Sequence, residues 1–140
     1  MTMRLLSNNI KGLMLVSGVL TSTMLYAAFF PGAALQSTFG EGVTGEATEM
    51  VVRNWGVLIF LMGVLLIQGA LNPALRRTAL AVAGASKAAF ILLVLANGSR
   101  YLAQGAAVPV VVDSVMVVLF VTYLISTRPR AAARPAGARA

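Results

Sequence analysis

This sequence of 140 residues contains no cysteine and no histidine. The lack of cysteine excludes disulfides, thiolate nucleophiles and iron–sulfur clusters, and without either residue type the usual zinc sites are excluded too. The lack of histidine removes the commonest general base and the catalytic triads and dyads that depend on it. Any chemistry must therefore come from carboxylates, amines, hydroxyls and aromatic rings.

Charged residues are also scarce, at 11%, whereas 59% of the residues are hydrophobic and the mean hydropathy is +0.86. A soluble domain usually has about 25% charged residues and about 45–50% apolar residues. Polar side chains are too few to cover a water-soluble globule. We therefore expect one compact membrane domain.

Long apolar runs predict transmembrane helices at about residues 10–30, 46–71, 78–96 and 108–126. Each is close to the ~20 residues that cross ~30 Å of hydrocarbon, and none alternates as a strand does. A secretory signal is the alternative for the first run, but a signal core of about 7–15 residues is shorter. The predicted fold class is all-α, a four-helix transmembrane bundle over residues 1–127, followed by a disordered basic tail at 128–140.

The basic residues predict the orientation of the bundle. If four helices cross, one side receives Arg4, Lys11, Arg76, Arg77, Arg128, Arg130, Arg134 and Arg139. The positive-inside rule then places both termini in the cytoplasm. Eight of the eleven basic residues thus flank apolar runs, and no basic face with interleaved aromatics is present, so the net charge of +7 does not indicate nucleic acid as a partner. The richness in Arg, Ala, Gly and Val suggests a bacterial chain, for which we expect the inner (plasma) membrane as the location and membrane lipids as partners.

The loop at residues 31–50, on the opposite side, has about 20 residues and no lysine or arginine. A loop of this length is commonly functional or contains structure of its own. Thr44 is expected to cap the second helix, with Glu46 in its first turn. Trp55 is expected in the aromatic belt at this interface.

Small residues recur along one side of several runs and are expected to face the interior, where they let helix backbones approach closely. They are Gly18 and Ser22; Gly56, Gly63 and Ala70; and Ala81, Ala85 and Ala89.

Three charged residues, Arg53, Lys87 and Asp113, lie in or near the hydrocarbon in the outer half of the bundle. An unpaired cation at the depth of Lys87 costs roughly 2.5–3.5 kcal/mol. Lys87 and Asp113 differ in depth by roughly 7 Å, a gap that the lysine stem can span, so a direct or water-bridged pair is plausible. Asn54 adjoins Arg53 and completes the candidate ligand-binding set.

Each of these charges has a simpler interpretation as well. Arg53 follows Glu49 by four residues, which is a favourable helix pair at an interface. Asp113 lies close enough to a helix start to be hydrated, and Lys87 with Asp113 could form a purely structural clasp. No catalytic residue, metal ligand or cofactor is expected.

Three stretches, residues 53–66 (RNWGVLIFLMGVLL), 71–77 (LNPALRR) and 112–116 (VDSVM), resemble small bacterial four-helix membrane proteins that are loosely DoxX-like. The resemblance implies a four-helix inner-membrane bundle. Some DoxX-like members are associated with quinone-linked redox complexes, and no motif carries that role onto particular residues here.

The sequence thus predicts a polar pocket in the outer half of the bundle that binds a lipid-like or quinone-like ligand. Arg53 and Lys87 would contact the ligand, Asp113 would orient Lys87, and the long outer loop would cover the mouth. The alternative is a non-catalytic accessory or self-associating subunit, as a homo-oligomer or within a larger membrane complex. An enzyme that uses the lysine and the carboxylate as base and acid is a third class.

Overall fold

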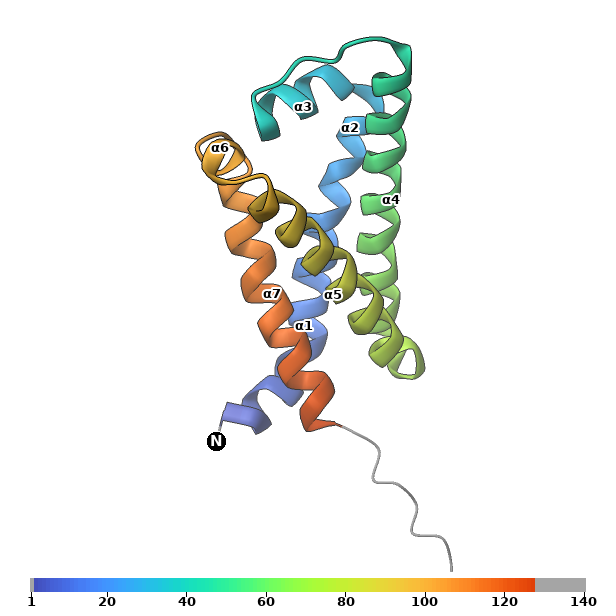
Figure 1. The fold of residues 1–140 in the computed structure, drawn as a ribbon. Helices are drawn as coiled ribbons and strands as arrows, with labels where there is room; N and C mark the ends of the chain where they lie inside the picture. The colour runs from blue at the N-terminus through green and yellow to red at the C-terminus, as the bar shows by residue number, and fades with distance from the viewer. Residues whose placement is uncertain (1, 128–140) are drawn as a thin grey trace, which may run out of the picture.

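The computed structural model describes residues 2–127, and all regular elements in that range are helical (Figure 1). They are α1 (Thr2–Ser22), a 3-10 turn η1 (Thr23–Leu25), α2 (Tyr26–Phe29), α3 (Pro31–Phe39), α4 (Glu46–Leu71), α5 (Pro73–Ala96), α6 (Ser99–Leu102) and α7 (Ala107–Ser126). The tail expected at 128–140 lies outside the described residues.

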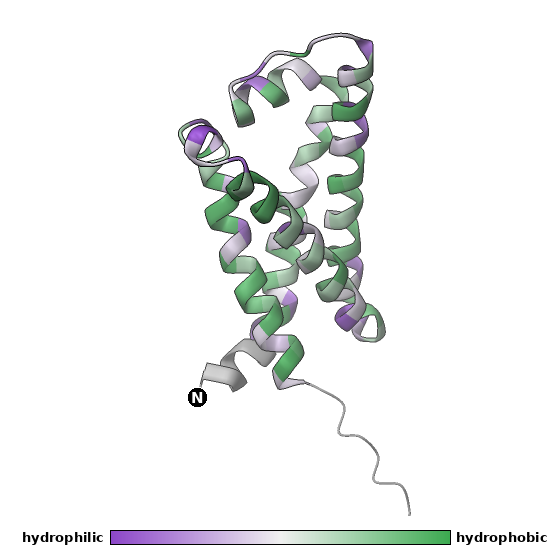
Figure 2. Ribbon diagram, in the orientation of Figure 1, coloured by the Kyte–Doolittle hydropathy of each residue, from purple (hydrophilic) through white to green (hydrophobic). Residues whose placement is uncertain are grey.

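Four stretches of this range are long and apolar enough to cross a membrane, namely Asn9–Phe29, Glu46–Leu71, Pro73–Ala96 and Ala107–Ser126. Their number and their helical character agree with the predicted all-α class and indicate a multi-pass membrane protein. Figure 2 shows hydrophobic residues along the middle of the long helices and hydrophilic ones gathered mainly toward the ends.

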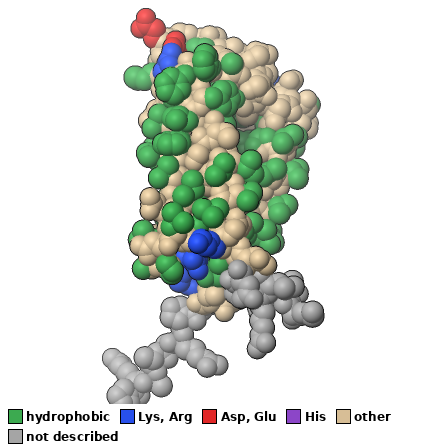
Figure 3. Space-filling model, turned by 180° about the vertical axis from the view of Figure 1, so that it is seen from behind, with side chains coloured by type: hydrophobic (Ala, Val, Ile, Leu, Met, Phe, Trp, Pro, Cys, Tyr) green, Lys and Arg blue, Asp and Glu red, His purple; other side chains and the backbone are tan. Residues whose placement is uncertain are grey.

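The two ends of the bundle differ in charge. At the basic end, α1 begins, α7 ends and α4 turns into α5, with Arg76 and Arg77 at the turn. At the opposite end, here called the capped end, lie α3, α6 and the glutamates at 41, 46 and 49. Figure 3 shows acidic atoms with basic atoms beside them at one end of a face rich in hydrophobic side chains, and basic atoms without acidic ones toward the other end.

Arginines complete the helix ends at the basic end. Arg76 donates to the carbonyl oxygens of Gly69 and Ala70 in the last turn of α4, at 3.3 and 3.2 Å. Arg77 donates to the Thr127 carbonyl oxygen, just past α7, at 2.7 Å. These carbonyls have no amide partner within their own helix, and a cation complements the negative end of the helix dipole.

Helix α5 begins at Pro73, five residues before the expected start at 78. The side chain of Asn72 caps it by accepting a hydrogen bond from the Ala74 amide at 3.0 Å. Proline suits the first helical position because the amide it lacks would have no partner there. Asn72 therefore both ends α4 and caps the start of α5.

The first membrane span is not one helix to residue 30 as expected. It passes through η1 and α2 and ends at Phe29, because Pro31 keeps Phe30 out of the helical region, with φ −127° and ψ 61°. Pro31 then starts α3 within the predicted loop, and α3 ends at Gly40 in the left-handed region, with φ 70°. The loop at residues 31–50 was expected to be functional or to contain structure of its own, and α3 is such structure.

The expected helix cap at Thr44 is wrong. Gly45, with φ 84°, occupies the N-cap position of α4 and makes no side-chain cap bond. The Thr44 carbonyl oxygen instead accepts a hydrogen bond from the Thr48 hydroxyl at 2.9 Å. Glu46 does lie in the first turn of α4, where the helix dipole favours an acid.

The long helices form a closed circuit in which α1 packs on α4, α4 on α5, α5 on α7, and α7 on α1. The main core lies toward the basic end and includes Ile10, Met14, Leu66, Leu80 and Phe120. Toward the capped end, α7 and the first span diverge (Figure 1).

Helix α3 bridges this divergence by resting on the segment between α6 and α7. A Cβ atom at Gly105 would lie only 1.8 Å from the Ser37 carbonyl oxygen of α3. The close approach of the two backbones therefore requires glycine at this position.

The small-residue stripes are partly as expected. Gly18, Gly56, Gly63 and Ala70 are buried between helices, which confirms the prediction for the first and second spans.

The stripe of Ala81, Ala85 and Ala89 is exposed, so its predicted inward orientation is wrong. Helix α5 instead buries the face that carries Leu80, Ala83, Lys87 and Val94. The spacing of small residues shows that they share one side of a helix, but not whether that side faces the interior. In α5 the amine of Lys87 favours the interior at this depth, and the alanine stripe lies on another side.

Candidate functional site

Lys87 of α5 and Asp113 of α7 form a direct ion pair in the capped half of the bundle. The Lys87 Nζ atom donates to Asp113 Oδ1 at 2.5 Å, and the two side chains are only 10% and 16% exposed. Among the described side chains, Lys87 is the only charged one in the buried class. Of the two expected arrangements, direct or water-bridged, the structure has the direct one.

Local packing puts both groups on the interface between their helices. Asp113 lies between Val110 and Met116, which are buried one turn before and one turn after it on α7. On α5, buried Ala83 precedes Lys87 by four residues and therefore lies on the same side of the helix. The small alanine leaves space next to the pair.

That space is a hollow of about 290 Å³, here called the inner hollow. Its wall is mostly apolar and comes from α1, η1, α3, α4, α5 and α7. The lining residues are Leu20, Thr21, Thr23, Met24, Thr38, Trp55, Ile59, Met62, Ala83, Ser86, Lys87, Phe90, Val108, Pro109, Val112, Asp113 and Met116. The ion pair is the only charged part of this described lining.

The inner hollow opens sideways. Its exposed lining residues include Leu20 on α1 and Val108 and Val112 on α7, the two spans that diverge toward the capped end. Thr38 of α3 contributes to the wall from the capped end. An amphiphile could therefore enter between α1 and α7 from the side where lipid would lie.

A hydroxyl without a partner lies within the wall of the inner hollow. Thr21, 8% exposed, lines the inner hollow, and its Oγ1 atom makes no hydrogen bond within the described part of the chain. Serine and threonine in helices often donate to the carbonyl four residues earlier, as Ser114 does to Val110 at 2.7 Å. Thr21 does not, and its oxygen is enclosed by protein atoms instead of being open to the hollow.

Sequence reasoning missed Thr21. Its four-residue spacing from buried Ser17 on α1 was a usable signal, because it placed both hydroxyls on one side of the helix. Ser17 Oγ likewise has no partner among the described residues.

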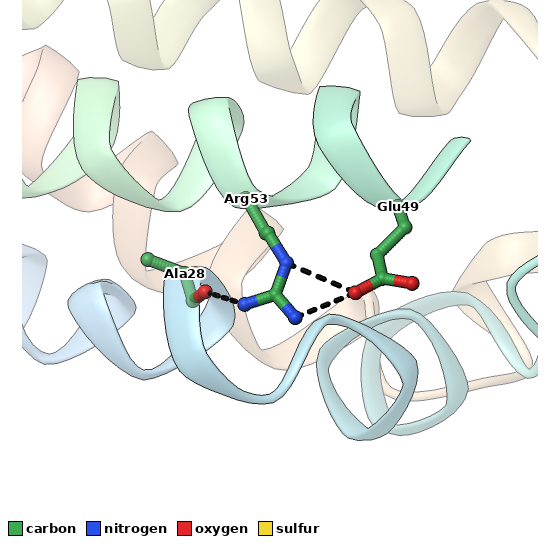
Figure 4. Close-up of polar contacts among 3 residues, drawn as sticks. All are labelled: Ala28, Glu49 and Arg53. Atoms are coloured by element: carbon green, nitrogen blue, oxygen red, sulfur yellow. Dashed lines mark hydrogen bonds and ion pairs between the residues drawn. The ribbon is translucent and has the colours of Figure 1, made fainter. Parts of the chain in front are cut away.

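Arg53 and Asn54 do not join the ion pair. Figure 4 shows the guanidinium of Arg53 directed to Glu49 and to the carbonyl oxygen of Ala28. Arg53 Nη2 lies 2.5 Å from Glu49 Oε1, which is the helix pair considered as the simpler interpretation. Neither Arg53 nor Asn54 belongs to the described lining of the inner hollow, so the expected convergence of three charges is wrong.

The direction of Arg53 follows from the broken first span. Because the chain leaves the helix at Phe30, carbonyls at the end of α2 lack the partners that a continuing helix would supply. Arg53 on the neighbouring α4 donates to one of them, that of Ala28. Its contribution to stability is small, since an exposed ion pair contributes about 0–1 kcal/mol.

A second, outer hollow of about 540 Å³ lies beneath α3 at the capped end. Four aromatic rings line it, those of Phe39, Trp55, Phe90 and Tyr101, together with the carboxylate of Glu41. Trp55 and Phe90 line both hollows and thus stand between them. Trp55 is half-buried and packs against Phe39 with ring centroids 5.9 Å apart, so it is more than the expected belt residue.

No protein-family model, no curated protein and no solved structure matches this chain. Functional interpretation therefore depends on the two hollows and on the charged and hydroxyl groups in their walls.

Proposed function

We propose that this protein binds a membrane-soluble amphiphile, lipid-like or quinone-like, in the inner hollow. The observation that carries the proposal is a largely buried ion pair in the wall of a mostly apolar hollow that opens sideways between two membrane helices. Ligand sites are typically apolar pockets with a few well-placed polar groups. Ionisable residues are rare within membrane spans because a charge in hydrocarbon is costly. One that is present is therefore a candidate functional group.

The chemistry of the wall suggests how such a ligand would lie. Lys87 has three N–H donors and gives one to Asp113, so Asp113 orients the amine and leaves donors for a ligand. A carbonyl or similar acceptor on the head of the amphiphile would contact these groups, with its apolar part along the methionine, leucine and aromatic wall. Arg53 and Asn54 are left out of this site.

We further propose that both termini lie in the cytoplasm of a bacterial cell and that the capped end faces outward from the inner membrane. The arginines at the basic end support this orientation through the positive-inside rule. Helix α3 then covers the outward end of the inner hollow, as proposed for the long loop. The DoxX-like resemblance is consistent with this arrangement and stays a prediction.

The binding test compares amphiphiles that remain with the protein after extraction of native membranes into polymer nanodiscs. In the double variant Lys87→Met, Asp113→Asn, both charges are lost together, and we expect retention of the ligand to fall about tenfold, the effect of one charged hydrogen bond. Lipids and quinones are quantified by mass spectrometry. Thr122→Ala, on the exposed side of α7, is the control and should leave retention unchanged. Equal retention by the double variant would refute the proposal.

A second candidate is a self-associating or accessory subunit of a membrane complex. The observation that favours it is the exposed stripe of Ala81, Ala85 and Ala89, because small residues allow a second helix to pack closely in lipid. Since the chain has no cysteine, Ala85→Cys should form disulfide-linked dimers in oxidised native membranes. Val111→Cys, on the exposed side of α7, reports random collision, and equal dimer yields would contradict self-association through α5.

A further inference from the structure

We propose that the outer hollow is a binding site for an organic ammonium group, and that Arg100 occupies the recognition groups of this site when no ligand is bound. The site is distinct in position and chemistry from the inner hollow. It would take a cation, whereas the inner hollow offers the N–H donors of Lys87 to an acceptor.

Aromatic rings from four helices gather around the outer hollow. Phe39 of α3 lies at the centre of the group, with its ring centroid 5.9 Å from that of Trp55 on α4 and 5.3 Å from that of Tyr101 on α6. Phe90 of α5 adds a fourth ring to the lining. Clustered aromatic faces attract ammonium groups through their quadrupoles, and tryptophan does so best.

The charge at this hollow has the matching sign. Glu41 is in its lining, and no lysine or arginine is among the described residues that line it. The side chain of Glu41 is 42% exposed, so its carboxylate can be reached from solution. Asn97, Thr44 and Thr48 make the rest of the rim polar. An ammonium group at the rim would meet a carboxylate and ring faces together.

Arg100 already uses these partners from outside the hollow. Its Nη2 atom lies 2.7 Å from Glu41 Oε1, and its guanidinium carbon lies 5.5 Å from the centroid of the Tyr101 ring. These are the carboxylate and ring contacts that a ligand ammonium would make. The Arg100 side chain is 73% exposed, and an exposed ion pair is weak enough to be exchanged for a competing cation. Arg100 therefore acts as an internal competitor.

The test uses the fluorescence of Trp55, the single tryptophan of the chain, which lines the hollow. Full-length protein in nanodiscs of uncharged galactolipid is titrated with phenyltrimethylammonium. We expect a saturable change that becomes about two- to fivefold tighter in Arg100→Gln, the range of one exposed ion pair. Glu41→Gln should weaken binding by a similar or larger factor. Glu46→Gln and Lys11→Gln, which remove single charges outside the hollow, should match the unchanged protein.

Two further variants separate recognition from loss of structure. Tyr101→Phe keeps the ring and should still bind the cation, whereas Tyr101→Leu removes the ring and should weaken binding, with helix content by circular dichroism equal in both. The proposal is overturned if Arg100→Gln shows no saturable response, or if Glu41→Gln binds as tightly as the unchanged protein. Repeating the titration in phosphatidylcholine nanodiscs identifies the source of the ligand. Weaker apparent binding there indicates a lipid headgroup, and equal binding indicates a free cation.

Discussion

Asp113→Asn is expected to destabilise the folded protein by about 3–5 kcal/mol, the range for a buried ion pair that loses one partner. The amine of Lys87 would remain in the interior, 10% exposed, without the carboxylate that now accepts its hydrogen bond at 2.5 Å. Lys87→Met should have an effect of the same sign, because it leaves the carboxylate unpaired. Titration from mild micelles into sodium dodecyl sulfate, followed by Trp55 fluorescence and circular dichroism, measures the free energy of unfolding.

The double variant Lys87→Met, Asp113→Asn supplies the decisive comparison. Because it leaves no unpaired charge, its stability should return to near that of the unchanged protein, and the double-mutant cycle should give a large coupling energy. Glu49→Gln breaks the exposed pair with Arg53 and is the control, with an expected effect of about 0–1 kcal/mol. If Asp113→Asn and Lys87→Met lower the free energy of unfolding no more than Glu49→Gln does, the Lys87–Asp113 pair is hydrated.

The same double variant distinguishes a clasp from a binding site. If it folds normally and still retains the amphiphile, the ion pair serves only to fix how α5 and α7 pack. If it folds normally and loses the amphiphile, the donors of Lys87 contribute to binding. Stability and retention must therefore be measured on the same preparation.

The number of membrane helices could be predicted from sequence because the bilayer sets their length. A helix that satisfies its own backbone needs about 20 apolar residues to cross, and this requirement is visible without tertiary structure. Lys87 and Asp113 could be matched for a similar reason, since both depths follow from counting residues along a helix.

Where Arg53 and the alanine stripe of α5 point around their helices could not be predicted in this way. Lys87 and Arg53 are both cations in membrane helices, yet Lys87 faces the interior and Arg53 contacts Glu49 and α2. Rotation about the helix axis is set by packing against neighbours, which the sequence does not state. The exposed position of Ala85 has the same origin. For α3, Pro31 and Gly40 are residue types that commonly start and end a helix. The position of α3 over the hollows, however, depends on its contact with Gly105, which the sequence does not reveal.

Gly63→Leu is expected to prevent stable folding, because Gly63 of α4 packs directly against the backbone of α1. A Cβ atom at this position would lie 2.3 Å from Ser22 Oγ, 2.6 Å from the Gly18 carbonyl oxygen and 2.7 Å from the Ser22 amide nitrogen. Two of these atoms belong to the backbone, so a rotamer change cannot relieve the overlap. Even Gly63→Ala must separate the helices, and we expect it to destabilise the fold by about 1–3 kcal/mol.

Gly84→Ala on α5 is the matched control. There the nearest atom to an added Cβ is Phe120 Cδ2 at 3.7 Å, which is ordinary contact, and alanine favours the helix by about 1 kcal/mol over glycine. The same detergent titration should therefore find Gly84→Ala at least as stable as the unchanged protein. In lipid, apolar burial gives no net drive to helix association, so close backbone approach is what holds α1 against α4. A Gly63→Ala protein of undiminished stability would contradict that account. Gly63 is buried within one chain, so its substitution should damage the monomer itself. A variant that folds as a normal monomer and loses only self-association would therefore also contradict the account.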